Sequence, residues 1–109
     1  MDDLVPLPGP LASFAVSVSP DRGVTVRISG ELDISSVDRL DAEVERVLAA
    51  APRRLIVDVS DVRFADSSAI AMWVRWAGAV PAFELRHPQP LLCRVISTMG
   101  LAAKLGVAT

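Results

Sequence analysis

The stretch Phe64-Ala65-Asp66-Ser67-Ser68-Ala69-Ile70 decides how this sequence folds. The apolar run Leu55 to Val59 precedes it and leads into it through a short loop, which predicts a buried strand followed by the start of a helix. Asp66 has the short acceptor side chain that caps helices, and two serines follow it in the first turn, where backbone N–H groups are unpaired. Two interpretations stay open: a hydroxyl that accepts a phosphate at the positive end of the helix dipole, or a cap made by Asp66 or Ser67 alone.

The composition predicts one small domain with a single core. The chain has 109 residues, with 11 basic and 13 acidic side chains spread along it and a net charge of -2. No basic stripe is present to neutralise a phosphate backbone, so we expect no direct nucleic-acid partner. One cysteine and one histidine exclude an internal disulfide and leave too few ligands for a zinc site. We therefore expect no metal and no cofactor.

Apolar residues make up 51% of the chain, which predicts a tightly packed core or a hydrophobic surface reserved for a partner. No uninterrupted apolar run approaches the ~20 residues of a membrane span. Residues 1–11 hold two acids, three prolines and no basic residue, so they do not form a secretory signal. We expect a cytoplasmic protein in which residues 1–13 are a flexible N-terminal arm and residues 14–109 are one domain.

Alternation and turn residues predict a β-hairpin at the start of the domain. Residues 14–18 and 24–28 alternate between apolar and polar side chains on either side of a Pro-Asp-Arg-Gly turn. Ser35 or Ser36 then caps a helix that Pro52 stops. The apolar positions of this helix recur at helical spacing at Val37, Leu40, Val44, Val47 and Leu48.

The second half alternates strands and helices. The run Leu55 to Val59 is apolar on both faces except at Asp58, which predicts an interior strand. A helix from Ser67 to about Gly78 is apolar nearly all round and should be the most buried one. Residues 83–86 predict a short strand, and Pro90 suits the first turn of a third helix. The buried side of that helix is expected at Leu91, Leu92, Val95, Ile96 and Met99.

The chain ends with a helix stop and a last strand fragment. Gly100 and Leu101 predict a helix C-cap with its hydrophobic contact, and residues 105–107 predict the strand. The predicted order is β-β-α-β-α-β-α-β, which gives an α/β fold with a mixed sheet flanked by helices.

This order and several short motifs resemble the STAS domain, whose best known soluble members are the anti-sigma factor antagonists. The motifs are Gly30-Glu31-Leu32-Asp33 before the first helix, Leu55 to Ser60 leading to Phe64-Ala65-Asp66-Ser67-Ser68, and Met99-Gly100-Leu101 near the end. The resemblance covers about residues 14 to 107. It implies the STAS-type mixed sheet and a regulatory protein that binds other proteins.

The resemblance also assigns roles to residues. In the antagonists, the partner anti-sigma kinase phosphorylates the serine that directly follows the loop aspartate, and that position here is Ser67. Asp33, Asp58, Asp66 and Ser68 are implied around the same helix end as contacts for the partner. Local structure offers another role for three of them: a turn residue at Asp33, a strand-end acid at Asp58 and a first-turn residue at Ser68.

Two departures from the family pattern stand out. Ala69 replaces the usual glycine, and we expect its methyl group to alter the fit where a partner's backbone approaches. Many members also carry a further C-terminal helix, whereas only Val107-Ala108-Thr109 follow the last apolar residues here. We expect this to expose apolar surface on the third helix and to favour a homodimer.

Three functions can be compared. In the first, the unphosphorylated protein binds an anti-sigma factor serine kinase and releases its sigma factor, phosphorylation of Ser67 reverses this, and a phosphatase restores it. In the second, the protein is a constitutive assembly subunit, either a stress-sensing scaffold or a partner of a lipid-transport ATPase, and Ser67 is a cap. An enzyme with Ser67 as nucleophile lacks support, because the only histidine, His87, lies in a strand-to-helix loop and no Gly-x-Ser-x-Gly surrounds Ser67.

Overall fold

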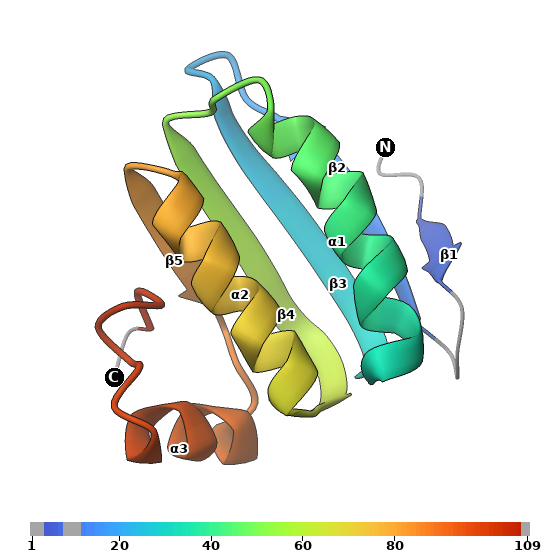
Figure 1. Cartoon of the computed structure of the whole chain (residues 1–109), viewed down its shortest axis with the longest axis vertical. Helices are drawn as coiled ribbons and strands as arrows, with labels where there is room; N and C mark the ends of the chain where they lie inside the picture. The colour runs from blue at the N-terminus through green and yellow to red at the C-terminus, as the bar shows by residue number, and fades with distance from the viewer. Residues whose placement is uncertain (1–3, 8–11, 108–109) are drawn as a thin grey trace.

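A five-stranded sheet with two helices packed on one face forms the body of the protein (Figure 1). The computed structural model describes residues 4–7 and 12–107. The elements in chain order are β1 (Val5–Leu7), β2 (Ala12–Val18), β3 (Gly23–Leu32), α1 (Ile34–Leu48), β4 (Arg54–Ala65), α2 (Ser67–Ala79), β5 (Ala82–Arg86) and α3 (Pro90–Thr98). The strands lie in the same order in the sheet, with antiparallel pairing from β1 to β3 and parallel pairing from β3 to β5. The predicted α/β fold with a mixed sheet is confirmed.

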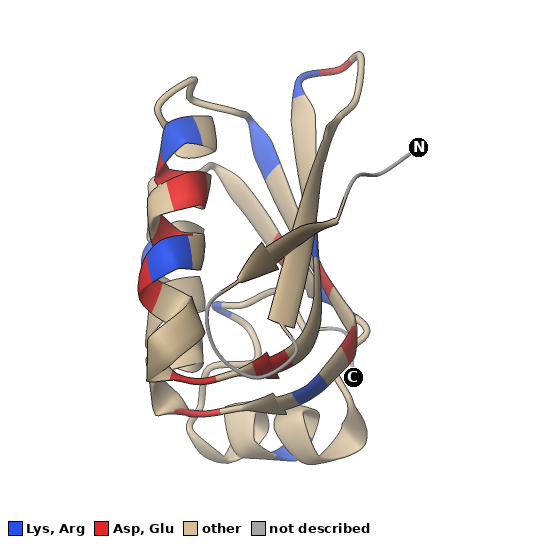
Figure 2. Cartoon of the chain, turned by 90° about the vertical axis from the view of Figure 1, so that its right-hand side faces the viewer, with Lys and Arg blue, Asp and Glu red and all other residues tan. Residues whose placement is uncertain are grey.

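The topology places α1 and α2 side by side. The connections β3-α1-β4 and β4-α2-β5 both cross in the same direction along the sheet, and right-handed crossovers then place both helices on one face. Figure 2 shows this face covered and α3 across one end of the sheet, while the opposite sheet face carries no helix of the described chain. Alternate strand residues such as Val26, Ile28 and Val57 are fully buried under the helices.

A partly buried aspartate in α1 joins the two helices. Trp76 of α2 is fully buried, and its Nε1 donates a hydrogen bond to Asp41 Oδ1 at 2.8 Å. Arg75 donates to Asp41 Oδ2 at 2.9 Å. The carboxylate therefore satisfies a buried indole N–H and holds α1 against α2.

The N-terminal segment differs from the predicted arm over residues 1–13. Residues 5–7 form β1 and pair with residues 12–14 of β2, so the sheet begins before residue 14. Leu7 and Ala12 are buried, and this burial stabilises a strand that is too short to show a period in the sequence. The other parts of the expected arm, residues 1–3 and 8–11, lie outside the described residues.

The strand β4 is longer than predicted, and the expected last strand is absent from the described residues. β4 continues to Ala65, so the short loop expected after Val59 is extended backbone with two register shifts against β3. Residues 105–107 form no strand, although Leu85 N donates to Leu105 O at 2.8 Å. Gly106, with φ +61°, turns the chain there instead.

The third helix exposes most of its predicted buried side. Ile96 is fully buried, but Leu91, Val95 and Met99 are 72%, 39% and 51% exposed. The reason is that α3 lies at the end of the sheet, where only one narrow side of the helix meets the core. Its predicted C-cap is confirmed by a hydrogen bond from Leu101 N to Ile96 O at 3.0 Å around Gly100.

The contribution of the contact between Asp41 and Trp76 to the stability of the protein can be measured. We expect Asp41→Ala to lower the free energy of unfolding by about 2 kcal/mol, because it leaves the buried Trp76 N–H without a partner. Asp38→Ala, at an exposed position of the same helix, is the control and should change it by less than about 0.5 kcal/mol. Urea unfolding measures both, and equal effects would contradict the assigned role of Asp41.

Candidate functional site

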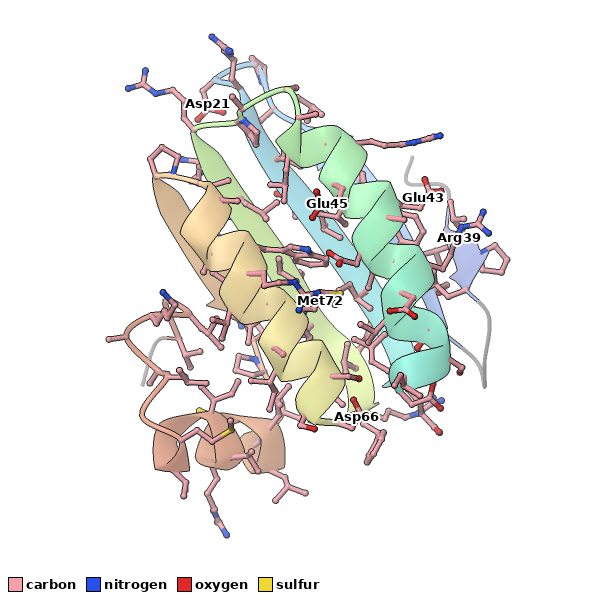
Figure 3. The ribbon with its side chains drawn as sticks, in the orientation of Figure 1. Asp21, Arg39, Glu43, Glu45, Asp66 and Met72 are labelled. Atoms are coloured by element: carbon pink, nitrogen blue, oxygen red, sulfur yellow. The ribbon has the colours of Figure 1, made fainter. Side chains whose placement is uncertain are left out.

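The register of β3 and β4 brings two helix starts together. The strands are parallel, and Leu32 lies opposite Ala65, the last residue of each strand. The next residues, Asp33 and Asp66, are therefore the N-caps of α1 and α2 at the same end of the sheet. Asp66 N donates to Leu32 O at 3.2 Å, which ties the two starts directly. Figure 3 shows Asp66 at this end, beside the first turns of both helices.

Asp66 and Ser68 make the cap of α2. The Asp66 Oδ1 atom accepts hydrogen bonds from Ser68 N at 3.0 Å and from Ala69 N at 3.3 Å. The Ser68 hydroxyl donates to the same carboxylate oxygen. The prediction that Asp66 caps this helix is thus confirmed, and Ser68 holds the capping carboxylate in place.

Ser67 is the exposed first residue of α2. Its hydroxyl makes no hydrogen bond to another residue in the described part of the chain. Because Asp66 already binds the N–H groups of the first turn, the alternative in which Ser67 itself is the cap is wrong. The site therefore presents an unused hydroxyl at the N-terminal end of a helix.

Asp33 caps α1 in a similar way. Its Oδ1 atom accepts from Ser35 N at 2.9 Å and from the Ser35 hydroxyl, while Asp33 N donates to Ser36 Oγ at 3.1 Å. The cap of α1 is therefore Asp33, two or three residues before the expected positions Ser35 and Ser36. The hydrogen bond from the Ser35 hydroxyl holds the pKa of the Asp33 carboxyl below its usual range. A carboxylate consequently lies at each of the two helix starts.

Asp58 lies elsewhere, which corrects its expected position near Ser67. It sits in β4 opposite Arg27 of β3 and Arg86 of β5, and its Oδ1 accepts from Ser60 N at 3.0 Å. Leu32 is five positions beyond Arg27 in β3, so Asp58 lies about 17 Å from the ends of the two strands at ~3.3 Å per strand residue. It cannot contact a small group bound at Ser67.

Ala69 also lies away from the surface on which the sequence predicted it. Its side chain is fully buried and belongs to the hydrophobic core, so it cannot meet the backbone of a partner at the surface. The methyl group that replaces glycine's hydrogen adds to the packing under α2. This departure from the family pattern thus concerns the core.

Two exposed apolar residues flank the helix starts and were missed as contact residues. Ile34, the first residue of α1, is 71% exposed, and Phe64, two residues before Asp66, is 54% exposed. The signal in the sequence is a large apolar residue within two positions of each capping aspartate. Arg63 also lies at this end, with its guanidinium 3.7 Å from the Glu31 carboxylate. The candidate site combines a hydroxyl, two capping carboxylates and two apolar side chains.

Over residues 4–7 and 12–107, no group of histidine, cysteine and acidic side chains could hold a metal ion. No helix within the described ranges has the length and apolar character needed to cross a membrane.

Comparison with protein families and solved structures identifies the fold. The family model described as "Mlab, STAS domain" matches residues 16–107. The chain belongs to the STAS domain family. A search of curated protein sequences finds no match.

Solved structures of anti-sigma factor antagonists resemble this STAS domain. The unphosphorylated form of SpoIIAA has a TM-score of 0.76 at 23% identity, with 88% of each chain covered. The phosphorylated form of the Bacillus protein SpoIIAA has a TM-score of 0.70 at 23% identity, with 88% of this chain and 91% of that chain covered. An anti-sigma factor antagonist from Mycobacterium paratuberculosis has a TM-score of 0.80 at 24% identity, with 91% of this chain and 87% of that chain covered. At these identities the likeness establishes the fold.

The division of roles between Asp66 and Ser67 can be measured. We expect Asp66→Ala to lower the free energy of unfolding by about 1 to 2 kcal/mol, because it removes the cap of α2. Ser67→Ala, one residue away, should change it by less than about 0.5 kcal/mol. If urea unfolding ranked the two variants in the opposite order, Ser67 would be the structural residue.

Proposed function

We propose that this STAS domain is an anti-sigma factor antagonist that acts as a phosphorylation switch. With Ser67 unmodified it binds an anti-sigma factor serine kinase, and the kinase then releases its sigma factor. Phosphorylation of Ser67 ends the binding, and a phosphatase restores it. The observation that carries the proposal is the exposed Ser67 hydroxyl at the start of α2, which the cap leaves unused. The resemblance to SpoIIAA, solved in unphosphorylated and phosphorylated forms, supports it.

The electrostatics of the site favour such a switch. Phosphate on Ser67 adds about -1.5 to -2 charges next to Asp66 and close to Asp33. The N–H groups of Ser68 and Ala69 already bind the Asp66 carboxylate, so these donors are not available to the phosphate. The helix dipole makes the added charge tolerable in the isolated protein. An acidic or close-packed kinase surface at the same site would face three negative groups and be repelled.

The proposed kinase surface follows from the positions of the side chains. Ser67 is at its centre, with Asp33 and Asp66 beside it. The Ser68 hydroxyl is hydrogen-bonded to the capping carboxylate of Asp66. Ile34 and Phe64 add the large apolar contacts that protein interfaces usually contain.

An enzymatic role for Ser67 has little support from the geometry. His87 directly follows Arg86, which lies opposite Asp58 in the parallel pair of β4 and β5. His87 is therefore next to the middle of β4, and Ser67 follows the end of that strand. A general base must lie within hydrogen-bond reach of its nucleophile, and His87 does not. We accordingly propose a binding module.

The switch is tested with three baits: wild type, Ser67→Ala and Ser67→Asp. Each is used for affinity capture in the source organism, and the kinase recovered with wild type is then purified for titration. We expect Ser67→Ala to bind like wild type and Ser67→Asp to bind at least about tenfold more weakly, a loss of ~1.4 kcal/mol. Incubation with the kinase and ATP should place one phosphate on Ser67. Equal binding of all three baits, or phosphate on another residue, would contradict the switch.

A second candidate is a constitutive assembly subunit, such as a partner of a lipid-transport ATPase. The observation that favours it is that the matching family model carries the description Mlab, whereas the likeness to SpoIIAA rests on 23% identity. In this case all three baits should retain the same subunits to the same extent.

A further inference from the structure

An apolar groove of about 260 Å³ lies between the end of β4 and α3. Its walls are Val62, Arg63, Phe64, Ala65, Gln89, Leu91, Leu92 and Val95. Val62 is almost fully buried at the bottom, whereas Phe64, Leu91 and Val95 project from the walls and are exposed. The groove is thus a hollow between apolar ridges.

The ridge on α3 is a continuous stripe. Leu91, Val95 and Met99 are four residues apart and therefore lie along one side of the helix, a different side from the buried Ile96. A row of three exposed large apolar side chains beside an apolar groove is unfavourable in water unless another surface covers it.

We propose that a second copy of this chain covers the groove in a two-fold symmetric dimer. A two-fold interface uses the same patch on both subunits, so the patch needs both a protruding side chain and a hollow that accepts the partner's side chain. This patch has both features, since Leu91 and Phe64 protrude and the hollow over Val62 can accept a side chain of the partner. In the dimer the α3 stripe of each copy packs into the groove of the other.

The charges beside the groove are complementary for such a pairing. Arg94 is exposed on α3, a helix with no carboxylate, and it has no ion pair with the described residues. Asp61 is exposed on β4, on the other side of the groove, and likewise has no ion pair within residues 4–7 and 12–107. It lines a polar hollow that shares Arg63 and Gln89 with the groove. Arg63, on the same side as Asp61, is already paired with Glu31 at 3.7 Å, so a two-fold axis through the groove brings Arg94 of one copy opposite Asp61 of the other.

The dimer does not require phosphorylation of Ser67, but its groove shares Phe64 with the proposed kinase surface, so the dimer and the kinase complex compete for this side chain. Ala65 forms part of the groove, and Ser67 is two residues further along the chain. A patch built on one short helix is small, so the pairing should be weak and depend on concentration.

Analytical ultracentrifugation of the full chain tests the dimer. We expect the average mass to rise from 11.6 kDa towards twice that value. The rise should occur between about 10 µM and 1 mM, the range of a weak interface. Leu91→Glu, at an exposed position, should remain monomeric over this range. The matched control Val18→Glu, exposed at the hairpin at the other end of the sheet, should dimerise like wild type.

Charge exchange tests the geometry of the pairing. We expect Arg94→Asp to weaken the dimer at least fivefold and the addition of Asp61→Arg to restore it. Circular dichroism checks that each variant is folded. A wild type that stays monomeric throughout, a Leu91→Glu variant that still dimerises, or a charge exchange without recovery would each overturn the proposed dimer.

Discussion

The hydrogen bond from Asp66 N to Leu32 O is the contact on which the site depends. It closes the parallel pair of β3 and β4 at the residues where both strands stop, and a helix starts from each strand at that point. Because the two helices then run back over the same sheet face, their positive N-terminal ends lie side by side. A surface that can hold several negative groups follows directly from this register.

Each helix start uses an aspartate to bind its unpaired N–H groups, and this choice leaves Ser67 available. A serine at the capping position would have its hydroxyl bound to the backbone, as in most N-caps. Asp66 is the cap and Ser68 is hydrogen-bonded to it. The side chain of Ser67, between them, makes no hydrogen bond within the described chain. The same atoms thus stabilise the helix and leave exposed the Ser67 hydroxyl, which is the phosphorylation site that we propose.

The sequence predicted those parts of the molecule that depend on local chemistry. The cap at Asp66 and the C-cap at Gly100 follow from side chains and turns within a few residues. The position of Asp58 could not be predicted, because the two register shifts between β3 and β4 are set by pairing across the sheet. The burial of Ala69 and the exposure of Leu91 likewise depend on what each helix side meets after folding, and helical periodicity alone does not give that.

Native-state hydrogen exchange at the Asp66 and Ser67 amides tests the central claim most directly. The Asp66 amide is bonded to Leu32 across the two strand ends, so it should exchange as slowly as amides inside β4. The Ser67 amide is in the first turn of α2, where the Asp66 carboxylate binds the two N–H groups that follow, and it should exchange rapidly. Rapid exchange at both positions would mean that the strand ends are open and that the two helix starts are not held together.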